Sequence, residues 1–153
     1  MEAAAAFLAV RPRSIGETTR RLRQLGYPQG LVDEVAARLI EAGYLDDDAF
    51  ARSWVESRDR ARPRGEFALR RELGQKGVSR TVVDEVLGER DEAAAGTDAD
   101  GAAAAALLTR KRPALERELD PHKRRQKAYA LLARAGFDPE TCREASSKVV
   151  DEV

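Results

Sequence analysis

Apolar residues recur every three or four positions along most of the chain, the spacing that places them on one face of an α-helix. Val82, Val83, Val86 and Leu87 form one such stripe. No segment alternates apolar and polar residues over a useful length, so strands are not expected. The pattern predicts an all-α fold. The expected helices cover residues 2–10, 14–25, 29–42, 47–60, 65–76, 79–88, 101–117, 121–135 and 138–152.

Four predicted helices end in a glycine followed by an apolar residue. A glycine just past a helix takes the left-handed backbone conformation without steric penalty, and the next residue folds back onto position C3 of the helix. In every case the residue at C3 is a leucine. The pattern therefore predicts one recurring helix stop. Its four copies are Leu22 with Gly26 and Tyr27, Leu39 with Gly43 and Tyr44, Leu73 with Gly77 and Val78, and Leu132 with Gly136 and Phe137.

Three of these stops mark copies of one unit. When Gly26 is aligned with Gly77, the sequence Val-Asp-Glu-Val at 32–35 falls on the same four residues at 83–86. Gly136 closes a third copy, which lies further along the chain. Repeats that contact only their neighbours stack in one direction. We therefore expect three tandem three-helix repeats forming an elongated, curved array.

The repeat boundaries follow from the stops and from the composition between them. We place repeat 1 at 1–45, repeat 2 at 46–91 and repeat 3 at 101–153. Residues 92–100 contain Gly96 and no large apolar side chain, so little would anchor them to a core. We expect this segment to be a flexible joint.

Helix starts are also visible in the sequence. Ser14 and Glu17 have the spacing of a capping box, in which the two side chains satisfy amide groups at the start of a helix. Asp120 and Asp138 each precede a proline, which suits Asp at the N-cap and Pro at the first helical position. Ser79 is expected to cap the sixth helix.

Composition excludes several classes of protein. The 153 residues contain 27 basic and 27 acidic side chains, so no overall positive field attracts a polyanion. The single cysteine, Cys142, cannot form an internal disulfide, and no Cys/His spacing indicates a zinc site. Residues 1–10 are too short to span a bilayer. We expect a cytoplasmic protein that does not associate with membranes.

No catalytic constellation is present in the sequence. Asp46, Asp47 and Asp48 could hold a metal ion, but they stand at the start of a predicted helix, where acidic residues serve as caps and interact favourably with the helix dipole, and we favour that role. Trp54 could stack on a base, but its spacing from Phe50 favours the core. His122 is expected to be solvated, and Cys142 to be a small buried apolar residue. We therefore predict no enzyme activity, no metal and no cofactor.

Basic residues form local clusters in all three repeats. Such clusters are either solvated helix faces or a binding surface, and their recurrence in corresponding helices favours a surface that binds a partner. The first comprises Arg20, Arg21 and Arg23. The second comprises Arg58, Arg60, Arg62, Arg64, Arg70 and Arg71. The third comprises Arg110, Lys111, Arg112, Arg117, Lys123, Arg124, Arg125 and Lys127.

Several motifs resemble those of the RecX family of regulatory proteins. The segment 43–51, Gly-Tyr-Leu-Asp-Asp-Asp-Ala-Phe-Ala, is similar to a signature of that family. The segments 62–78 and 11–14 and the pair Gly136-Phe137 also resemble family motifs. The residue after the capping Glu is Thr18, where the family usually has Leu.

The resemblance implies a regulator, mainly an inhibitor, of the RecA recombinase. Such a protein would bind the RecA filament on DNA and modulate its recombination, ATPase and SOS coprotease activities. We expect a monomer that contacts RecA through the basic clusters, with weak direct contact to DNA. The alternative is a helix-turn-helix-like module that acts directly on DNA through Arg20, Arg21 and Arg23, although the pI of about 6.6 argues against strong intrinsic affinity. An unspecialised helical adaptor is a third alternative.

Overall fold

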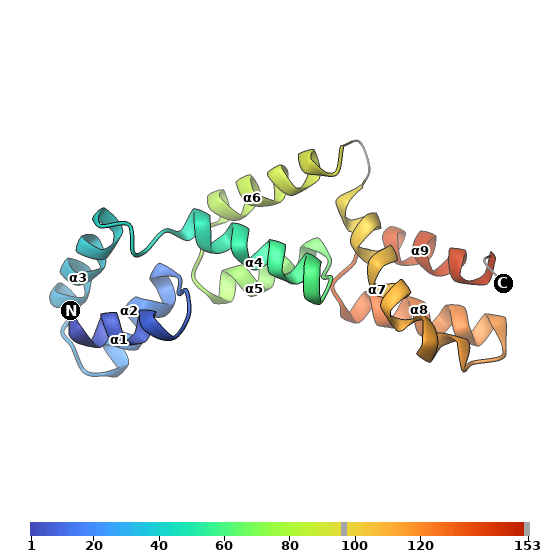
Figure 1. Cartoon of the computed structure of the whole chain (residues 1–153), viewed down its shortest axis with the longest axis horizontal. Helices are drawn as coiled ribbons and strands as arrows, with labels where there is room; N and C mark the ends of the chain where they lie inside the picture. The colour runs from blue at the N-terminus through green and yellow to red at the C-terminus, as the bar shows by residue number, and fades with distance from the viewer. Residues whose placement is uncertain (96–97, 152–153) are drawn as a thin grey trace. The chain divides into compact units, whose positions relative to one another are not determined.

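The computed structural model describes residues 1–95 and 98–151, and these ranges contain nine α-helices and no strand (Figure 1). The prediction of an all-α fold is therefore confirmed. The helices are α1 (Glu2–Val10), α2 (Ile15–Gln24), α3 (Gln29–Glu41), α4 (Asp47–Ala61), α5 (Glu66–Gln75), α6 (Arg80–Ala93), α7 (Ala99–Glu116), α8 (Pro121–Arg134) and α9 (Pro139–Asp151).

The chain forms two compact units. The first unit contains Met1–Trp54 and Glu72–Val86, and the second contains Val55–Arg71 and the residues from Leu87 onward. Helices α4, α5 and α6 each contribute residues to both units. Helices α1 to α3 lie in the first unit, and α7 to α9 lie in the second.

Two predicted boundaries around the proposed joint are wrong. Helix α6 continues through Gly88 to Ala93, and α7 begins at Ala99, so both ends of the segment 92–100 are helical. Glycine lowers helix propensity only modestly, and tertiary contacts can override it. Here Arg90 of α6 pairs with carboxylates of α4 and α7, which fixes the last turns of α6. Of the predicted joint, Gly96 and Thr97 lie outside the described residues.

The helix starts use the side chains that the sequence indicates. Ser14 Oγ accepts a hydrogen bond from the Glu17 N–H at 3.1 Å, and the Glu17 carboxylate accepts one from the Ser14 N–H at 3.5 Å. Asp120 caps α8 by accepting from the His122 N–H at 2.9 Å, and Ser79 caps α6 by accepting from the Val82 N–H at 3.3 Å. Each bond satisfies an amide that has no partner within its own helix.

Four helices end with the same backbone geometry. The glycines after α2, α3, α5 and α8 all have positive φ angles, from +77° to +91°. In each case the next residue donates its N–H to the carbonyl of the leucine at C3, with N···O distances between 2.9 and 3.2 Å. This is the Schellman arrangement. The four bonds are Tyr27 to Leu22, Tyr44 to Leu39, Val78 to Leu73, and Phe137 to Leu132.

The side chains that follow these glycines differ in solvent exposure. Val78 and Phe137 are buried, but Tyr27 is 42% exposed and Tyr44 is 72% exposed. The expected apolar contact with the helix is therefore wrong for Tyr44, whose place in the core is taken by the buried Leu45. A tyrosine tolerates this position because its hydroxyl can remain in water.

The core of the first repeat is built from α1, α2 and α3 together with Leu45. Its buried residues are Ala4, Leu22, Val32, Val35, Leu39 and Leu45. Thr18, which stands where the resembling family usually has Leu, is fully buried and donates its hydroxyl to the Ser14 carbonyl at 2.9 Å. That bond removes the penalty of burying the hydroxyl.

Trp54 is not a core residue. It is half-buried, stacks on Phe50 at 5.9 Å between ring centroids, and donates its indole N–H to the Glu72 carboxylate at 2.8 Å. The ammonium group of Lys76 lies 5.4 Å from the centre of the indole ring. The predicted proximity of Phe50 and Trp54 is present, but the indole lies at the edge of the apolar cluster, where its N–H can reach a carboxylate.

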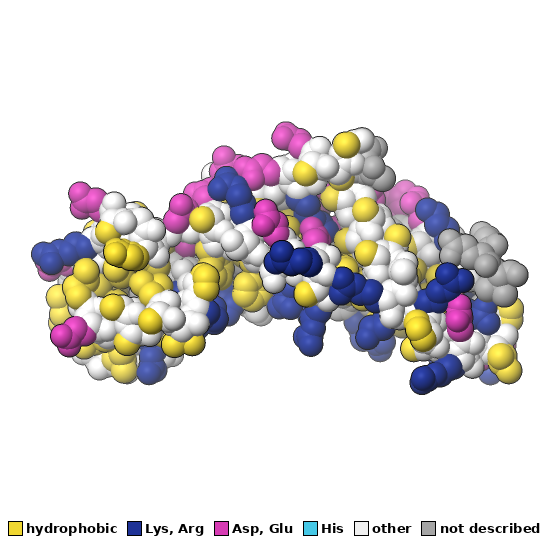
Figure 2. All heavy atoms as spheres, viewed as in Figure 1, with side chains coloured by type: hydrophobic (Ala, Val, Ile, Leu, Met, Phe, Trp, Pro, Cys, Tyr) yellow, Lys and Arg dark blue, Asp and Glu magenta, His cyan; other side chains and the backbone are white. Residues whose placement is uncertain are grey.

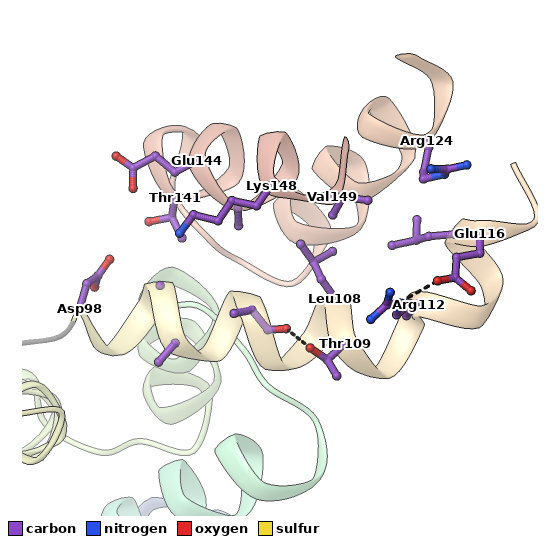
Figure 3. Close-up of a pocket in the computed structure, with 15 residues that line it drawn as sticks. Asp98, Leu108, Thr109, Arg112, Glu116, Arg124, Thr141, Glu144, Lys148 and Val149 are labelled. Atoms are coloured by element: carbon purple, nitrogen blue, oxygen red, sulfur yellow. Dashed lines mark hydrogen bonds and ion pairs between the residues drawn. The ribbon is translucent and has the colours of Figure 1, made fainter. Parts of the chain in front are cut away.

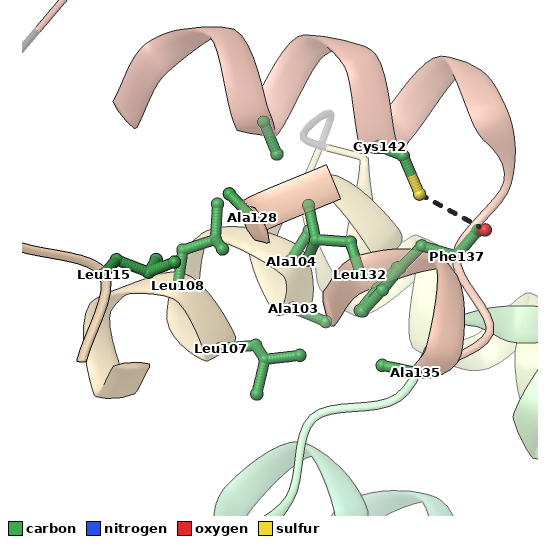
Figure 4. Close-up of a cluster of buried hydrophobic side chains, with 11 residues drawn as sticks. Ala103, Ala104, Leu107, Leu108, Leu115, Ala128, Leu132, Ala135, Phe137 and Cys142 are labelled. Carbon is green, nitrogen blue, oxygen red and sulfur yellow. Dashed lines mark hydrogen bonds between the residues drawn. The ribbon is translucent and has the colours of Figure 1, made fainter. Parts of the chain in front are cut away.

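The third repeat has a continuous apolar core between α7, α8 and α9 (Figure 4). Leu132 and Ala128 are completely buried, and Phe137 and Cys142 contact the same cluster. The Cys142 thiol donates a hydrogen bond to the Phe137 carbonyl, with 3.5 Å between sulfur and oxygen. Burial raises the pKa of this thiol above its ordinary value. Cys142 is therefore a buried core residue rather than a reactive thiol.

Candidate functional site

The three predicted basic clusters differ in how they are exposed. Arg20, Arg21 and Arg23 of α2 are all exposed and belong to the first unit. Arg23 donates to the side-chain oxygen of Gln29 at 2.7 Å. This cluster therefore lies on an exposed face of α2.

The second cluster belongs to the second unit. Arg62 and Arg71 are exposed, whereas Arg58, Arg64 and Arg70 are half-buried. Arg70 forms an ion pair with Glu66 one turn earlier on α5, at 2.9 Å. Pairs of this kind stabilise a helix slightly and reduce the charge available to a partner. Arg70 therefore presents less positive charge than the sequence suggests.

One residue of the third cluster, Arg124, differs from the prediction. Lys123, Arg125 and Lys127 are exposed, as expected, but Arg124 is only 8% exposed. Its guanidinium donates to the Glu118 carbonyl from Nε at 3.0 Å and from Nη2 at 2.8 Å. A cation suits this place because carbonyl groups at the end of α7 carry partial negative charge. The expectation that Arg124 lies on the wetted face of α8 is therefore wrong.

The structure brings part of the second cluster together with part of the third in one groove of the second unit. The groove has a volume of about 480 Å³ and an apolar floor of Pro63, Leu107, Leu131 and Ala135. Basic side chains surround this floor, and no lining residue is acidic. They are Arg62, Arg64, Arg110, Lys111 and Arg134. Figure 2 shows Lys and Arg side chains gathered where the end of α4 lies beside α7. We call this site the basic groove.

Close backbone packing holds the two walls of the basic groove together. The Gly65 N–H donates to the Ala135 carbonyl at 2.9 Å. A Cβ atom at Gly65 would lie 2.3 Å from the Gly136 carbonyl oxygen, so only glycine permits this approach. The Arg110 guanidinium donates to the carbonyls of Arg60 and Ala61, where it neutralises the negative end of α4. The loop 62–65 is thereby fixed against α7 and α8.

A buried ion cluster fixes the start of α7. Arg90 of α6 forms bonds to both oxygens of Asp59 at 3.0 Å and to Asp100 of α7 at 2.7 Å. Asp100 also accepts from the Glu66 N–H at 3.0 Å. Burial alone would lower the pKa of Arg90, but the hydrogen bonds to Asp59 and Asp100 raise it above its ordinary value. Arg90 therefore remains charged and joins α4, α6 and α7.

The acidic residues at the start of α4, Asp46 to Asp48, include two that accept hydrogen bonds from backbone amides. Asp46 accepts from the Ala49 N–H at 3.1 Å, and Asp47 accepts from the Ile15 N–H at 2.9 Å. Burial raises the pKa of Asp47, and the neighbouring Asp46 and Asp48 raise it further. In the part of the chain that the structure describes, no three His, Cys, Asp or Glu side chains are placed to hold a metal ion. His122 is exposed on α8.

Sequence reasoning missed two members of this arrangement. Arg134 was not assigned to a basic cluster, although it lies in the last turn of α8, just before the stop at Gly136. Gly65 was noted only within a motif. The contact between Gly65 and Ala135 joins residues of different repeats. Comparing the repeats with one another therefore does not indicate it. No local signal in one sequence reveals it.

These features define a helical repeat protein with a basic groove between helices of its second and third repeats. Models of the first, second and third three-helix domains of RecX match residues 1–39, 46–87 and 98–145. The chain belongs to the RecX family.

Named relatives agree with this assignment. The chain is 36% identical over 142 residues to the regulatory protein RecX of Chlorobium phaeobacteroides (strain BS1), covering 93% of this chain and 87% of the relative. It is 33% identical over 144 residues to the regulatory protein RecX of Prosthecochloris aestuarii (strain DSM 271 / SK 413), covering 94% and 89%. These relatives are named regulatory proteins, which supports a regulatory role for this chain.

A solved structure agrees on the fold. The crystal structure of RecX from Lactobacillus salivarius has a TM-score of 0.78 to this chain at 18% identity, covering 99% of this chain and 94% of that one. Among the helices of the described ranges, none combines the length and the apolar character that a membrane span requires.

Proposed function

We propose that this protein regulates the RecA recombinase, mainly as an inhibitor, by binding the RecA filament on DNA. Membership of the RecX family supports a regulatory role, and the basic groove supports an acidic target. The groove carries five cationic residues and no acidic one in a chain whose formal net charge is zero. Such a concentration of one sign favours an acidic protein surface or DNA phosphates and accelerates encounter with them.

The groove itself suits contact with a protein surface or a nucleic acid backbone. Arg62 and Arg134 can form bidentate bonds with carboxylates or phosphates because a guanidinium presents parallel donors. The apolar floor of Leu107 and Leu131 would bury carbon atoms of the partner. Arg110 is committed to the end of α4, so it contributes charge and rigidity.

The alternative function is direct binding to DNA without RecA. Its support is the exposed face of Arg20, Arg21 and Arg23 on α2, which resembles the basic face of a helix-turn-helix module. The first test is therefore to measure binding to single-stranded DNA, to duplex DNA and to RecA filaments on the same DNA at one salt concentration. Preference for the filament supports the proposed function, and equal affinity for bare DNA supports the alternative.

A second test identifies which of the two basic surfaces contacts RecA. In one variant Arg62, Lys111 and Arg134 are changed to Glu, and in the matched control Arg20, Arg21 and Arg23 are changed to Glu. All six side chains are exposed, and both variants change the net charge equally, so stability should change little. The assay is inhibition of RecA-catalysed ATP hydrolysis across a salt series.

We expect the groove variant to lose inhibition and the control to retain it. The reverse result would move the interface to α2. If both variants inhibit like the parent with the same salt dependence, neither basic surface is the interface. Circular dichroism of both variants must show unchanged helicity for the comparison to count.

A further inference from the structure

The third repeat contains a second, apolar groove that shares no lining residue with the basic groove. It lies between α7 and α9 and has a volume of about 420 Å³. Its floor is formed by Ala105, Leu108, Leu115, Ala145 and Val149. Figure 3 shows Leu108 of α7 and Val149 of α9 pointing toward one another across it. An elongated apolar channel of this kind is the shape that accepts the apolar face of a helix.

Arg124 stands at one end of this groove, beside Glu116 and Val149 (Figure 3). It is more than nine-tenths buried, and its hydrogen bonds from Nε and Nη2 go to one carbonyl oxygen, that of Glu118. It forms no ion pair with a carboxylate of the described residues. A guanidinium has five donors, so the remaining N–H groups can bind an incoming anion.

The nearby carboxylates are occupied by other cations. Glu116 pairs with Arg112 at 2.7 Å, and Glu118 pairs with Lys127 at 2.8 Å. A buried cation without a counter-ion is unfavourable, and a carboxylate placed against it would form strong charge-assisted bonds. The end of the groove is thus built to receive negative charge.

The two ends of the groove differ in charge. At the far end Asp98 and Glu144 outnumber the ammonium group of Lys148, which reaches toward Thr141 (Figure 3). At the near end Arg112 and Arg124 outnumber Glu116. A nucleic acid would be repelled by the far end, whereas a helix with opposite charges at its two ends complements both. A helix also carries partial positive charge at its N-terminus and partial negative charge at its C-terminus.

We propose that this groove binds an amphipathic helix of a partner protein, with its N-terminal end near Asp98 and a carboxylate of its C-terminal end paired with Arg124. The leucine-type side chains of the bound helix would fill the space between Leu108 and Val149. This site does not depend on the proposed function, because none of its residues belongs to the basic groove.

The probe is a fluorescein-labelled amphipathic peptide with leucines on one helical face, a lysine in its first turn and a glutamate in its last turn. A matched peptide has glutamine in place of that glutamate. The groove is blocked by A105F, and the control is A106F. Both alanines are exposed on α7, but only Ala105 lines the groove.

We expect the glutamate peptide to bind the full-length protein about tenfold more tightly than the glutamine peptide, as fluorescence anisotropy would measure. A105F should weaken binding about tenfold and A106F should leave it unchanged. In R124Q the two peptides should bind equally. If R124Q does not fold, the two peptides and the variants A105F and A106F still decide the question.

Three outcomes would overturn the proposal. The first is equal affinity of the parent protein for the two peptides. The second is equal binding by A105F and A106F. The third is no binding of the glutamate peptide at about 1 mM, a concentration at which even a weak specific contact is detected.

Discussion

Gly136 is a position where one added methyl group should disturb the protein strongly. Its φ angle is +88°, and a Cβ atom there would lie 2.3 Å from the Cβ of Ala68 and 2.7 Å from the Ala68 backbone nitrogen. Gly43 has a similar φ of +81°, but nothing lies within 4 Å of its added Cβ. Alanine should therefore have a similar backbone penalty at both positions, but it clashes with neighbouring atoms only at Gly136.

The magnitudes follow from these distances. Left-handed backbone costs an L-residue about 1–2 kcal/mol, so Gly43→Ala should lower the free energy of unfolding by about that amount. At Gly136 the clash with α5 adds an overpacking penalty of about 1–3 kcal/mol, giving about 2–5 kcal/mol in total. For a chain of this length each kcal/mol corresponds to about 2–4 °C in Tm.

Thermal unfolding followed by circular dichroism tests this expectation. Gly88→Ala is the control within the same compact unit, because Gly88 is helical and open, so alanine should stabilise the protein by about 0.5–1 kcal/mol. If Gly136→Ala and Gly43→Ala lower Tm equally, Gly136 does not pack against Ala68 and the described approach of α8 to α5 is wrong.

Two further expectations concern the core and the ion cluster. Leu73→Ala should lower the free energy of unfolding in urea by about 2–4 kcal/mol, because Leu73 is completely buried; a midpoint like that of the parent would contradict this. Arg90→Met should lower it by about 3–5 kcal/mol by leaving Asp100 buried without its cation, whereas Arg80→Met on the exposed start of α6 should change little; equal effects would show that the ion cluster contributes nothing.

Local signals predicted most of the secondary structure. The helix stop at Gly77 and the capping box at Ser14 depend on residues within a few positions of each other, so the sequence alone is enough to recognise them. The same reasoning failed at Gly88, where it treated a glycine as a boundary. Helix α6 continues there because Arg90 reaches Asp59 and Asp100, which lie 31 and 10 residues away in the sequence, beyond the reach of a local helix signal.

The two grooves were predicted less well, because they also depend on contacts between residues distant in the sequence. Arg62 and Lys111 were both recognised as members of basic clusters, but their convergence on one groove depends on the contact of Gly65 with Ala135. Arg124 was assigned, together with the other cations of its cluster, to an exposed basic face that binds a partner. The structure instead directs it to the Glu118 carbonyl, a contact that charge patterning cannot indicate.

The pH dependence of the free energy of unfolding tests whether the Glu17 side chain stabilises the protein through its charge or through its shape. Its carboxylate lies 2.8 Å from Arg11, 3.6 Å from Arg13 and 3.7 Å from Lys76, and its side chain is only 10% exposed. Burial alone would raise the pKa of Glu17, but the hydrogen bond from Arg11 and the charges of Lys76 and Arg11 hold it below its ordinary value. Glu17 is therefore more stable as a carboxylate in the folded protein than in the unfolded chain.

Because the folded pKa of Glu17 is lowered, its contribution to stability is fully present above the unfolded value of about 4.5 and is lost as the pH falls through the folded value. Glu17→Gln keeps a capping side chain and removes the charge. It should lower the free energy of unfolding in urea by about 1–2 kcal/mol at neutral pH, and the difference from the parent should shrink below about pH 4. Glu34→Gln, which removes an exposed partner of Arg38, should cost about 0–1 kcal/mol. A Glu17→Gln difference that stays constant down to about pH 2 would mean that the carboxylate contributes through its shape rather than its charge.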